Sequence, residues 1–299
     1  MSQFPISAIR SVEIGTPDLE KAESFYTDVW GLEVAARQGG AVYLRATGRD
    51  HHVLVLHPNN QPEIRSVTFR TSLAEDLPAL CAAVAANGGR ILQPKEASRE
   101  PGGGIMATVA TPQGHVLRFV HGDLLRTSSG PRKNLPLRLA HVNLNCNDLE
   151  ATTRFFEAAL GFHVTDRSKA MAFLRCNADH HAVVLADSGI DGLNHVAYLM
   201  PEFDSVMCGS GRMIDHGYPI GWGVGRHGPG NNIFAYFLDS AGFVVEYTAD
   251  VLQVDDSYKV GGPDDWKWPP GRTDRWGIAP PKSDAVKKAQ LAIRFARSE

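Results

Sequence analysis

The feature that most constrains this chain is an internal repeat. The stretch RSVEIGTPDLEKAESFYTDVWGLEV, which begins at Arg10, resembles AHVNLNCNDLEATTRFFEAALGFHV, which begins at Ala140, at an offset of 130 residues. The offset falls to 129 between RSVTF at Arg65 and NHVAY at Asn194, and to 128 between Ala110 and Leu238. An offset that stays nearly constant from one aligned block to the next is typical of a duplicated sequence. We therefore predict two homologous halves.

Each half divides again into two similar units. Every quarter opens with an alternating strand, namely VEIGT, VTFRT, VNLNC or VAYLM. Aspartates at 18 and 148 are N-cap signals and predict helices over 19–30 and 149–160, and 72–88 is expected to be the helix of the second quarter. Short β-rich runs follow each helix. The sequence therefore predicts an α+β fold of four βαβββ modules, in which each half forms a cup-like incomplete β-barrel.

The composition between and after the repeats sets the domain boundaries. We expect an N-terminal half at 1–122, a polar linker rich in Ser, Gly and Pro at 123–137, and a catalytic half at 138–250. The remaining 251–299 is a C-terminal tail that carries Trp266, Trp268 and Trp276 and is expected to cover the site or an interface. An amphipathic helix is predicted from Ser283 to the end of the tail.

Charge and composition exclude several partners. The chain has 299 residues and a formal net charge of -3, with no basic stripe, which argues against a nucleic-acid partner. No apolar run approaches the roughly 20 residues that a membrane helix needs, which argues against a membrane partner. Cys81, Cys146, Cys176 and Cys208 are scattered, which favours reduced thiols. We expect a cytoplasmic protein that forms a homo-oligomer.

The repeat also shows where the two halves differ in chemistry. The second half has His, His and Glu where the first has Ser, Ser and Arg: His141 for Ser11, His195 for Ser66, and Glu246 for Arg118. A single histidine on a strand is usually a packed or exposed side chain. Two imidazoles and one carboxylate at equivalent places, however, form the ligand set of non-heme Fe(II) oxygenases. We therefore predict a metal site in the second half and none in the first.

The stretch GRHGPGNNIFAYFLDSAGFVVEYT, from Gly225, resembles a family signature. The chain looks like a type I extradiol ring-cleavage dioxygenase of the vicinal oxygen chelate superfamily, and the resemblance covers about residues 5–250. It implies that His141, His195 and Glu246 hold the metal. Ser240 replaces the usual proline of the turn, and Ala235 replaces a large aliphatic residue. Because of these two departures, the resemblance does not specify the identity of the substrate.

The resemblance also implies roles for further residues. His181 matches the histidine that supports oxygen attack and proton transfer, and His227 and Tyr236 match groups that contact the substrate hydroxyls. Asn231 stands where several members place an asparagine beside the site. Three aromatic residues are candidates either for the wall of the pocket or for the core: Phe173, Trp222 and Tyr247. The first-half pair His51 and His52 is interpreted as a relic on a strand.

The activity that the resemblance implies is Fe(II)-dependent insertion of O2 into a catechol-type aromatic diol with meta ring cleavage. Mn(II) is also accepted by such ligands. Three alternatives stay open: a hydroquinone-cleaving dioxygenase, another metal-dependent enzyme of the superfamily such as a glyoxalase-like isomerase, and a non-catalytic small-molecule binding protein. There is no cluster of arginines in the 220s, so the sequence does not favour a ring with a carboxylate.

Overall fold

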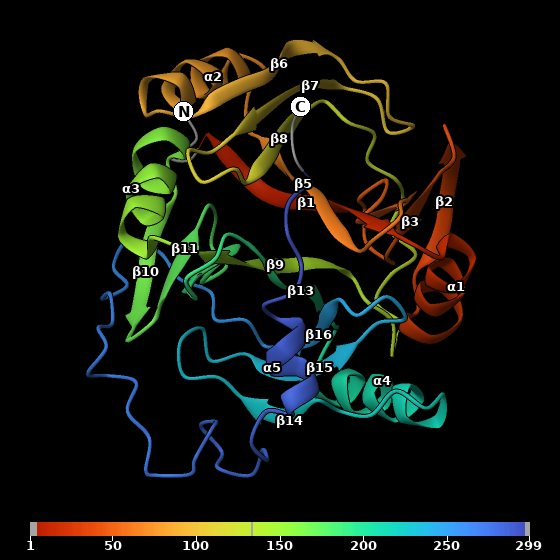
Figure 1. Cartoon of the computed structure of the whole chain (residues 1–299), viewed down its shortest axis with the longest axis vertical. Helices are drawn as coiled ribbons and strands as arrows, with labels where there is room; N and C mark the ends of the chain where they lie inside the picture. The colour runs from red at the N-terminus through yellow and green to blue at the C-terminus, as the bar shows by residue number, and fades with distance from the viewer. Residues whose placement is uncertain (1–4, 133, 297–299) are drawn as a thin grey trace.

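The computed structural model describes residues 5–132 and 134–296, which form two eight-stranded sheets (Figure 1). The first sheet contains β1 (Ile6–Thr16), β2 (Glu33–Gln38), β3 (Ala41–Arg45), β4 (Leu54–Pro58), β5 (Glu63–Thr71), β6 (Arg90–Ala97), β7 (Ile105–Ala110) and β8 (Val116–His121). The second contains β9 (Arg138–Cys146), β10 (His163–Ser168), β11 (Met171–Arg175), β12 (Val183–Asp187), β13 (Gly192–Leu199), β14 (Trp222–Arg226), β15 (Ile233–Leu238) and β16 (Val244–Ala249).

The order of strands confirms the predicted fold class. The first sheet runs β2-β3-β4-β1-β5-β8-β7-β6, and the second repeats this order as β10-β11-β12-β9-β13-β16-β15-β14. In each half, two βαβββ modules meet at a central antiparallel pair, β1 with β5 or β9 with β13. The sheets are open and do not close into barrels. Because β13 lies between β9 and β16, side chains from these three strands can converge on one face.

The structure contains each helix that the sequence predicts in the repeats, with one difference in geometry and one in length, and an additional helix at 203–215. They are α1 (Leu19–Ser24), the π-helical η1 (Phe25–Trp30), α2 (Asp76–Ala86), α3 (Leu149–Leu160), α4 (Phe203–Asp215) and α5 (Asp284–Ala289). The helix predicted over 19–30 changes to π geometry at Phe25. The helix predicted over 72–88 begins only at Asp76, whose carboxylate accepts a hydrogen bond from the backbone of Leu73. No helix among the described residues is long and apolar enough to span a bilayer.

The two halves share a core. α3 of the second half contacts α2 of the first, and α4 contacts η1, so helices pair across the halves (Figure 1). The fully buried Trp30 stacks on Tyr247 with ring centroids 3.7 Å apart. Phe69 meets Phe162 edge to face. The hydrophobic interior is therefore continuous between the sheets.

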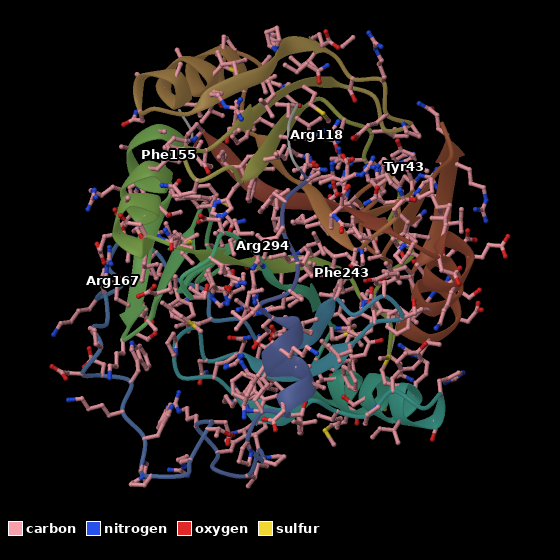
Figure 2. The ribbon with its side chains drawn as sticks, in the orientation of Figure 1. Tyr43, Arg118, Phe155, Arg167, Phe243 and Arg294 are labelled. Atoms are coloured by element: carbon pink, nitrogen blue, oxygen red, sulfur yellow. The ribbon has the colours of Figure 1, made fainter. Side chains whose placement is uncertain are left out.

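The C-terminal tail returns to both sheets. Ser283 caps α5 as predicted, but the helix ends at Ala289 and does not continue to the end of the chain. The following residues form single bridges to the sheets instead, Ile293 with Leu193 and Phe295 with Ile64. Figure 2 labels Arg294, which lies between these two bridges, in the middle of the molecule. A β-branched and an aromatic residue suit this extended pairing better than a further helical turn.

Candidate metal centre

Three neighbouring strands bring the predicted ligands to one face of the second sheet. His141 is on β9, His195 is on β13 and Glu246 is on β16. Ala197 of β13 pairs with both His141 and Glu246, so these side chains share its face. His195 lies two residues before Ala197, and alternation along a strand puts it on the same face. The strand register therefore dictates that the three side chains converge.

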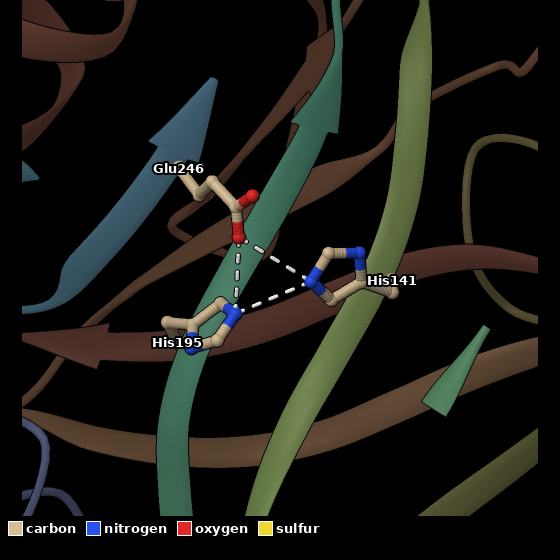
Figure 3. A group of neighbouring side chains, drawn as sticks. All are labelled: His141, His195 and Glu246. Atoms are coloured by element: carbon tan, nitrogen blue, oxygen red, sulfur yellow. Dashed lines mark hydrogen bonds and ion pairs between the residues drawn. The ribbon is translucent and has the colours of Figure 1, made fainter. Parts of the chain in front are cut away.

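The three side chains meet at one point inside the cup (Figure 3). Glu246 Oε2 lies 3.3 Å from His141 Nε2 and 3.1 Å from His195 Nε2, and the two nitrogens are 3.2 Å apart. Both histidines are 3% exposed and Glu246 is fully buried. Among residues 5–132 and 134–296, this is the one set of three such side chains that could hold a metal ion.

The donor set fits a divalent metal. Ligands bound at about 2.1 Å in neighbouring positions of an octahedron lie about 3 Å apart, as these three atoms do. Glu246 Oε2 has no hydrogen-bond donor, although it is buried. Burial raises the pKa of Glu246, but the adjacent imidazoles hold it well below its ordinary value. Burial lowers the pKa of His195 to about 4. A carboxylate and a neutral imidazole are the protonation states that bind metals.

Hydrogen bonds behind His195 fix which of its nitrogens faces the centre. The Nδ1–H of His195 donates to Asn194 Oδ1 at 2.9 Å, which leaves the Nε2 lone pair pointing to Glu246. Asn194 Oδ1 also accepts a bond of 2.6 Å from Gln290 Nε2, at the end of α5. Gln290 in turn accepts from Lys282 at 2.8 Å. The tail therefore supports a predicted ligand through a chain of hydrogen bonds.

His181 lies on one side of the centre. Its ring centroid is 4.4 Å from that of His141, and the edge of Phe173 packs against it at 5.5 Å. Burial is the largest reason why the pKa of His181 lies well below 6.5, so the neutral imidazole predominates at pH 7. His181 precedes β12 and is not on a strand.

His227 and Tyr236 lie together on another side. The Tyr236 hydroxyl oxygen is 3.2 Å from His227 Nε2 and 3.5 Å from His195 Nε2. His227 stacks on Phe234 with ring centroids 4.0 Å apart. Burial lowers the pKa of His227 to about 3 and, with Glu246 nearby, raises the pKa of Tyr236 well above 10. Both groups are therefore neutral at pH 7.

A cavity of about 210 Å³ connects these groups. It is lined by the predicted His141, Phe173, His181, His195, Trp222, His227 and Tyr236, together with Asn143, Asn194, Asn232, Trp266, Trp268, Thr273, Lys282 and Gln290. Several of the second group come from the tail, which has no counterpart in the repeat. No comparison between the two halves could have identified them.

Two predicted pocket residues lie elsewhere. Asn231 adopts a positive φ of 51°, and its side chain accepts a bond of 2.5 Å from Arg275 outside the cavity. The next residue, Asn232, is buried and lines the cavity instead. Tyr247 belongs to the core, where its hydroxyl donates to the backbone of Trp30. The sequence placed the asparagine one position too early, because the turn at 228–231 reverses the chain.

The equivalent place in the first half is filled by ion pairs. Arg118 contacts Glu13 and Glu100, where the second half has Glu246 and its histidines. The hydroxyls of Ser11 and Ser66 are buried and have no partner among the described residues. Figure 2 labels Arg118 in this half. A cation at this point disfavours the binding of a metal ion.

The histidine pair of the first half is not on a strand. His51 and His52 precede β4 and are buried, and His52 contacts Arg10 and Glu100. The pair is therefore part of a buried polar cluster. Burial lowers the pKa of His52 to about 4, which keeps it neutral beside Arg10.

Comparisons with known proteins agree with the sequence signature. The family model described as Glyoxalase/Bleomycin resistance protein/Dioxygenase superfamily matches residues 8–119 and 138–247. Metapyrocatechase 2 of Cupriavidus necator is 38% identical over 120 residues, which cover 39% of this chain and 38% of that protein. A manganese-dependent 2,3-dihydroxybiphenyl 1,2-dioxygenase of Geobacillus genomosp. 3 is 25% identical over 264 residues, 78% of this chain and 82% of that one.

A solved structure is similar over nearly the whole chain. The Mn(II)-bound glyoxalase from Novosphingobium aromaticivorans has a TM-score of 0.88 and is 31% identical, and the match covers 99% of this chain and 96% of that one. Because this match includes the tail, the likeness extends beyond the two repeats.

Proposed function

Because the chain belongs to the Glyoxalase/Bleomycin resistance protein/Dioxygenase superfamily, we propose that it is an extradiol dioxygenase that cleaves a catechol-type aromatic diol with O2. One observation carries the proposal. The cavity is lined by His141 and His195, which contact Glu246, and it also presents His181 on one side and the His227–Tyr236 pair on another. The dioxygenase relatives support the same activity.

The proposed metal ligands are His141, His195 and Glu246, and the proposed metal is Fe(II), with Mn(II) as the alternative. A divalent metal held there would lower the pKa of a diol hydroxyl and couple electron transfer from the diol to O2. Two neutral imidazoles and one carboxylate leave coordination positions open for this. Ligands on three rigid strands need little rearrangement when the metal binds.

The remaining residues would bind the ring and move protons. Phe173 and Trp222 wall the cavity with apolar surface and exclude water. The neutral His227 and the Tyr236 hydroxyl can hold the two substrate oxygens by hydrogen bonds, since both lie beside the ligands. The neutral His181 can accept a proton and return it. In the overall reaction one ring carbon–carbon bond breaks, and both atoms of O2 enter the product.

We further propose that 138–250 is the catalytic half, that 1–122 is its metal-free counterpart across the linker 123–137, and that 251–299 covers the cavity. The wall formed by Trp266 and Trp268 supports this role for the tail. A homo-oligomer in the cytoplasm is also proposed. The exposed apolar side chains of Met207 and Ile214 on α4 support association, and the four free cysteines support a reducing compartment. Light scattering tests the oligomer, and a monomer would contradict it.

The test is anaerobic loading with Fe(II) or Mn(II), followed by catechol and air. We expect a yellow product and the uptake of about one O2 per diol, as the reaction requires. The Glu246→Gln variant should neither retain metal after dialysis nor take up O2. Glu150→Gln, an exposed acid on α3, serves as the matched control and should behave like the wild type. Absence of O2 uptake with every diol and hydroquinone would contradict the proposal.

Isomerisation is the second candidate, because the similar solved structure is named a glyoxalase. The same metal-loaded protein should therefore be assayed with the hemithioacetal of methylglyoxal and glutathione. Turnover of this compound without any O2 uptake would favour the isomerase. Against it, the neutral His227 and Tyr236 lie together beside the ligands, where they suit the two oxygens of a diol.

A further inference from the structure

Lys282 lies in the wall of the cavity but has no part in the proposed mechanism. It comes from the tail, just before α5. Its Nζ lies 4.6 Å from the centroid of the Trp222 ring and 6.0 Å from that of Tyr236. It donates one hydrogen bond, of 2.8 Å, to Gln290 Oε1. An ammonium has three donors, so two of them remain available on the side of the cavity.

The charge of Lys282 has no carboxylate partner. No ion pair joins it to an acidic side chain of the described residues, whereas Lys287 on the following helix α5 pairs with Asp284. Among the acidic side chains, Glu246 has the largest electrostatic effect on Lys282 and raises its pKa. Burial lowers the pKa of Lys282 to about 8, so the ammonium still predominates at pH 7. A charge in such a place normally has a partner, because desolvation without one is costly.

The proposed metal makes this imbalance larger. One divalent cation, one carboxylate and one ammonium, with neutral histidines, leave the cavity with two positive charges in excess. A diol that binds as a monoanion supplies only one negative charge. A carboxylate elsewhere on the same molecule would supply the other and would accept hydrogen bonds from Lys282.

We propose that Lys282 binds an anionic substituent of the substrate, so that the preferred substrate is an aromatic diol that carries a carboxylate. This inference rests on the proposed dioxygenase function and adds the class of diol. It also departs from the expectation that a carboxylated ring is not specially favoured. That expectation considered only arginines in the 220s, whereas the cation comes from the tail, some 55 residues later in the chain. The contact with Trp222 holds the ammonium in place.

The experiment compares matched pairs of diols with the metal-loaded full-length protein. One pair is 3,4-dihydroxyphenylacetate with 4-ethylcatechol, and the other is 2,3-dihydroxybenzoate with 3-methylcatechol, so both ring positions are covered. Dissociation constants are measured without O2 by calorimetry, and kcat/KM is measured in air. In at least one pair, the acid should bind about 10- to 100-fold more tightly than its neutral partner, as expected for a charged hydrogen bond.

Variants of Lys282 identify the group responsible. Lys282→Met should weaken the binding of the acid about 10- to 100-fold more than it weakens the binding of the neutral diol, whereas Lys282→Arg should keep the preference for the acid. Lys287→Met, an exposed lysine on α5, is the matched control and should keep it too. Equal losses for both diols in Lys282→Met, or equal wild-type affinities within both pairs, would overturn the inference but leave the dioxygenase function standing. Failure to take up O2 with any of the four diols would overturn both.

Discussion

The chemistry of the centre depends on atoms that the metal would not touch. A histidine binds a metal through one nitrogen only when the other carries the proton. In His195 the Nδ1–H donates to Asn194 Oδ1, and the same oxygen accepts a hydrogen bond from Gln290 Nε2. Asn194 also donates to Asn145 at 3.0 Å, which fixes the orientation of the amide. The buried side-chain amide of Asn194 therefore fixes the orientation of the His195 ring.

Replacement of Asn194 by alanine is expected to weaken metal binding by about 10- to 100-fold, the usual cost of losing such a supporting group. The reason is that His195 Nδ1 loses its acceptor and the ring can turn or change tautomer. Competition with a coloured chelator measures the affinity. The Asn59→Ala variant, which removes a partly exposed asparagine of the first half, is the control. Unchanged affinity in Asn194→Ala would show that the strand alone positions His195.

Single residues were predictable from the sequence wherever the repeat gave a comparison. His141, His195 and Glu246 stood out because their counterparts Ser11, Ser66 and Arg118 cannot form the same site, and the structure brings the three together. Lys282 and Gln290 lie outside the repeat, so nothing in the sequence related them to the cavity. The error of one position at Asn231 arose in a turn, where neighbouring side chains point in different directions.

At the scale of elements, the hairpin formed by β15 and β16 positions Glu246 at the candidate metal centre. Its turn is organised by Asp239, whose Oδ1 accepts bonds of 2.8 Å from the backbone of Ala241 and Phe243. Gly242 follows with a φ of 93°, a conformation that favours glycine. The other carboxylate oxygen accepts from the Tyr26 hydroxyl of the first half at 2.8 Å. Burial raises the pKa of Asp239 to about 6, despite these bonds.

This raised pKa makes the stability of the fold depend on pH. The folded state binds the Asp239 proton more tightly than the unfolded state, in which the pKa is about 3.9. Stability from this group is therefore present in full below about pH 4 and is lost as the pH rises through about 6. The loss is about 3 kcal/mol, from roughly two pKa units at 1.4 kcal/mol each.

The Asp239→Asn variant has no proton to release at this position. The free energy of unfolding in urea, measured from pH 4 to pH 7 for both proteins, should show a wild type that falls relative to the variant by about 3 kcal/mol. Taking the difference removes the titration of all groups common to both. Parallel profiles would contradict the raised pKa and mean that the hydrogen bonds to Asp239 fully offset the effect of its burial.

Elements were predictable to the extent that local signals define them. The capping aspartates and the glycine after each helix located α3 and the start of α1, and alternation located the strands that open each module. The π-helical turn of η1 was not predictable, because its cause is not local. Phe25 and Trp30 pack there against Tyr218 and Tyr247 of the second half. Likewise α5 ends early because the residues beyond it pair with distant strands.

At the scale of the whole molecule, the two halves cannot be treated as independent domains. Besides the stack of Trp30 on Tyr247, the Arg212 side chain of α4 donates to the backbone oxygens of Val29 and Trp30. The tail then crosses from one sheet to the other, since Leu193 and Ile64 both bridge to it. The first half therefore supports the half that contains His141, His195 and Glu246, because Tyr247 directly follows Glu246 on β16.

Replacement of Trp30 by alanine tests this shared core. Loss of a fully buried tryptophan is expected to cost about 3 to 5 kcal/mol of unfolding free energy. Because the ring belongs to both halves, urea unfolding followed by circular dichroism and by tryptophan fluorescence should remain one coincident transition at a lower midpoint. The control is Leu124→Ala, whose side chain is 52% exposed and whose loss should cost about 0.5 kcal/mol or less. Two separate transitions in Trp30→Ala, with metal retained through the first, would contradict this coupling and show that the second half folds alone.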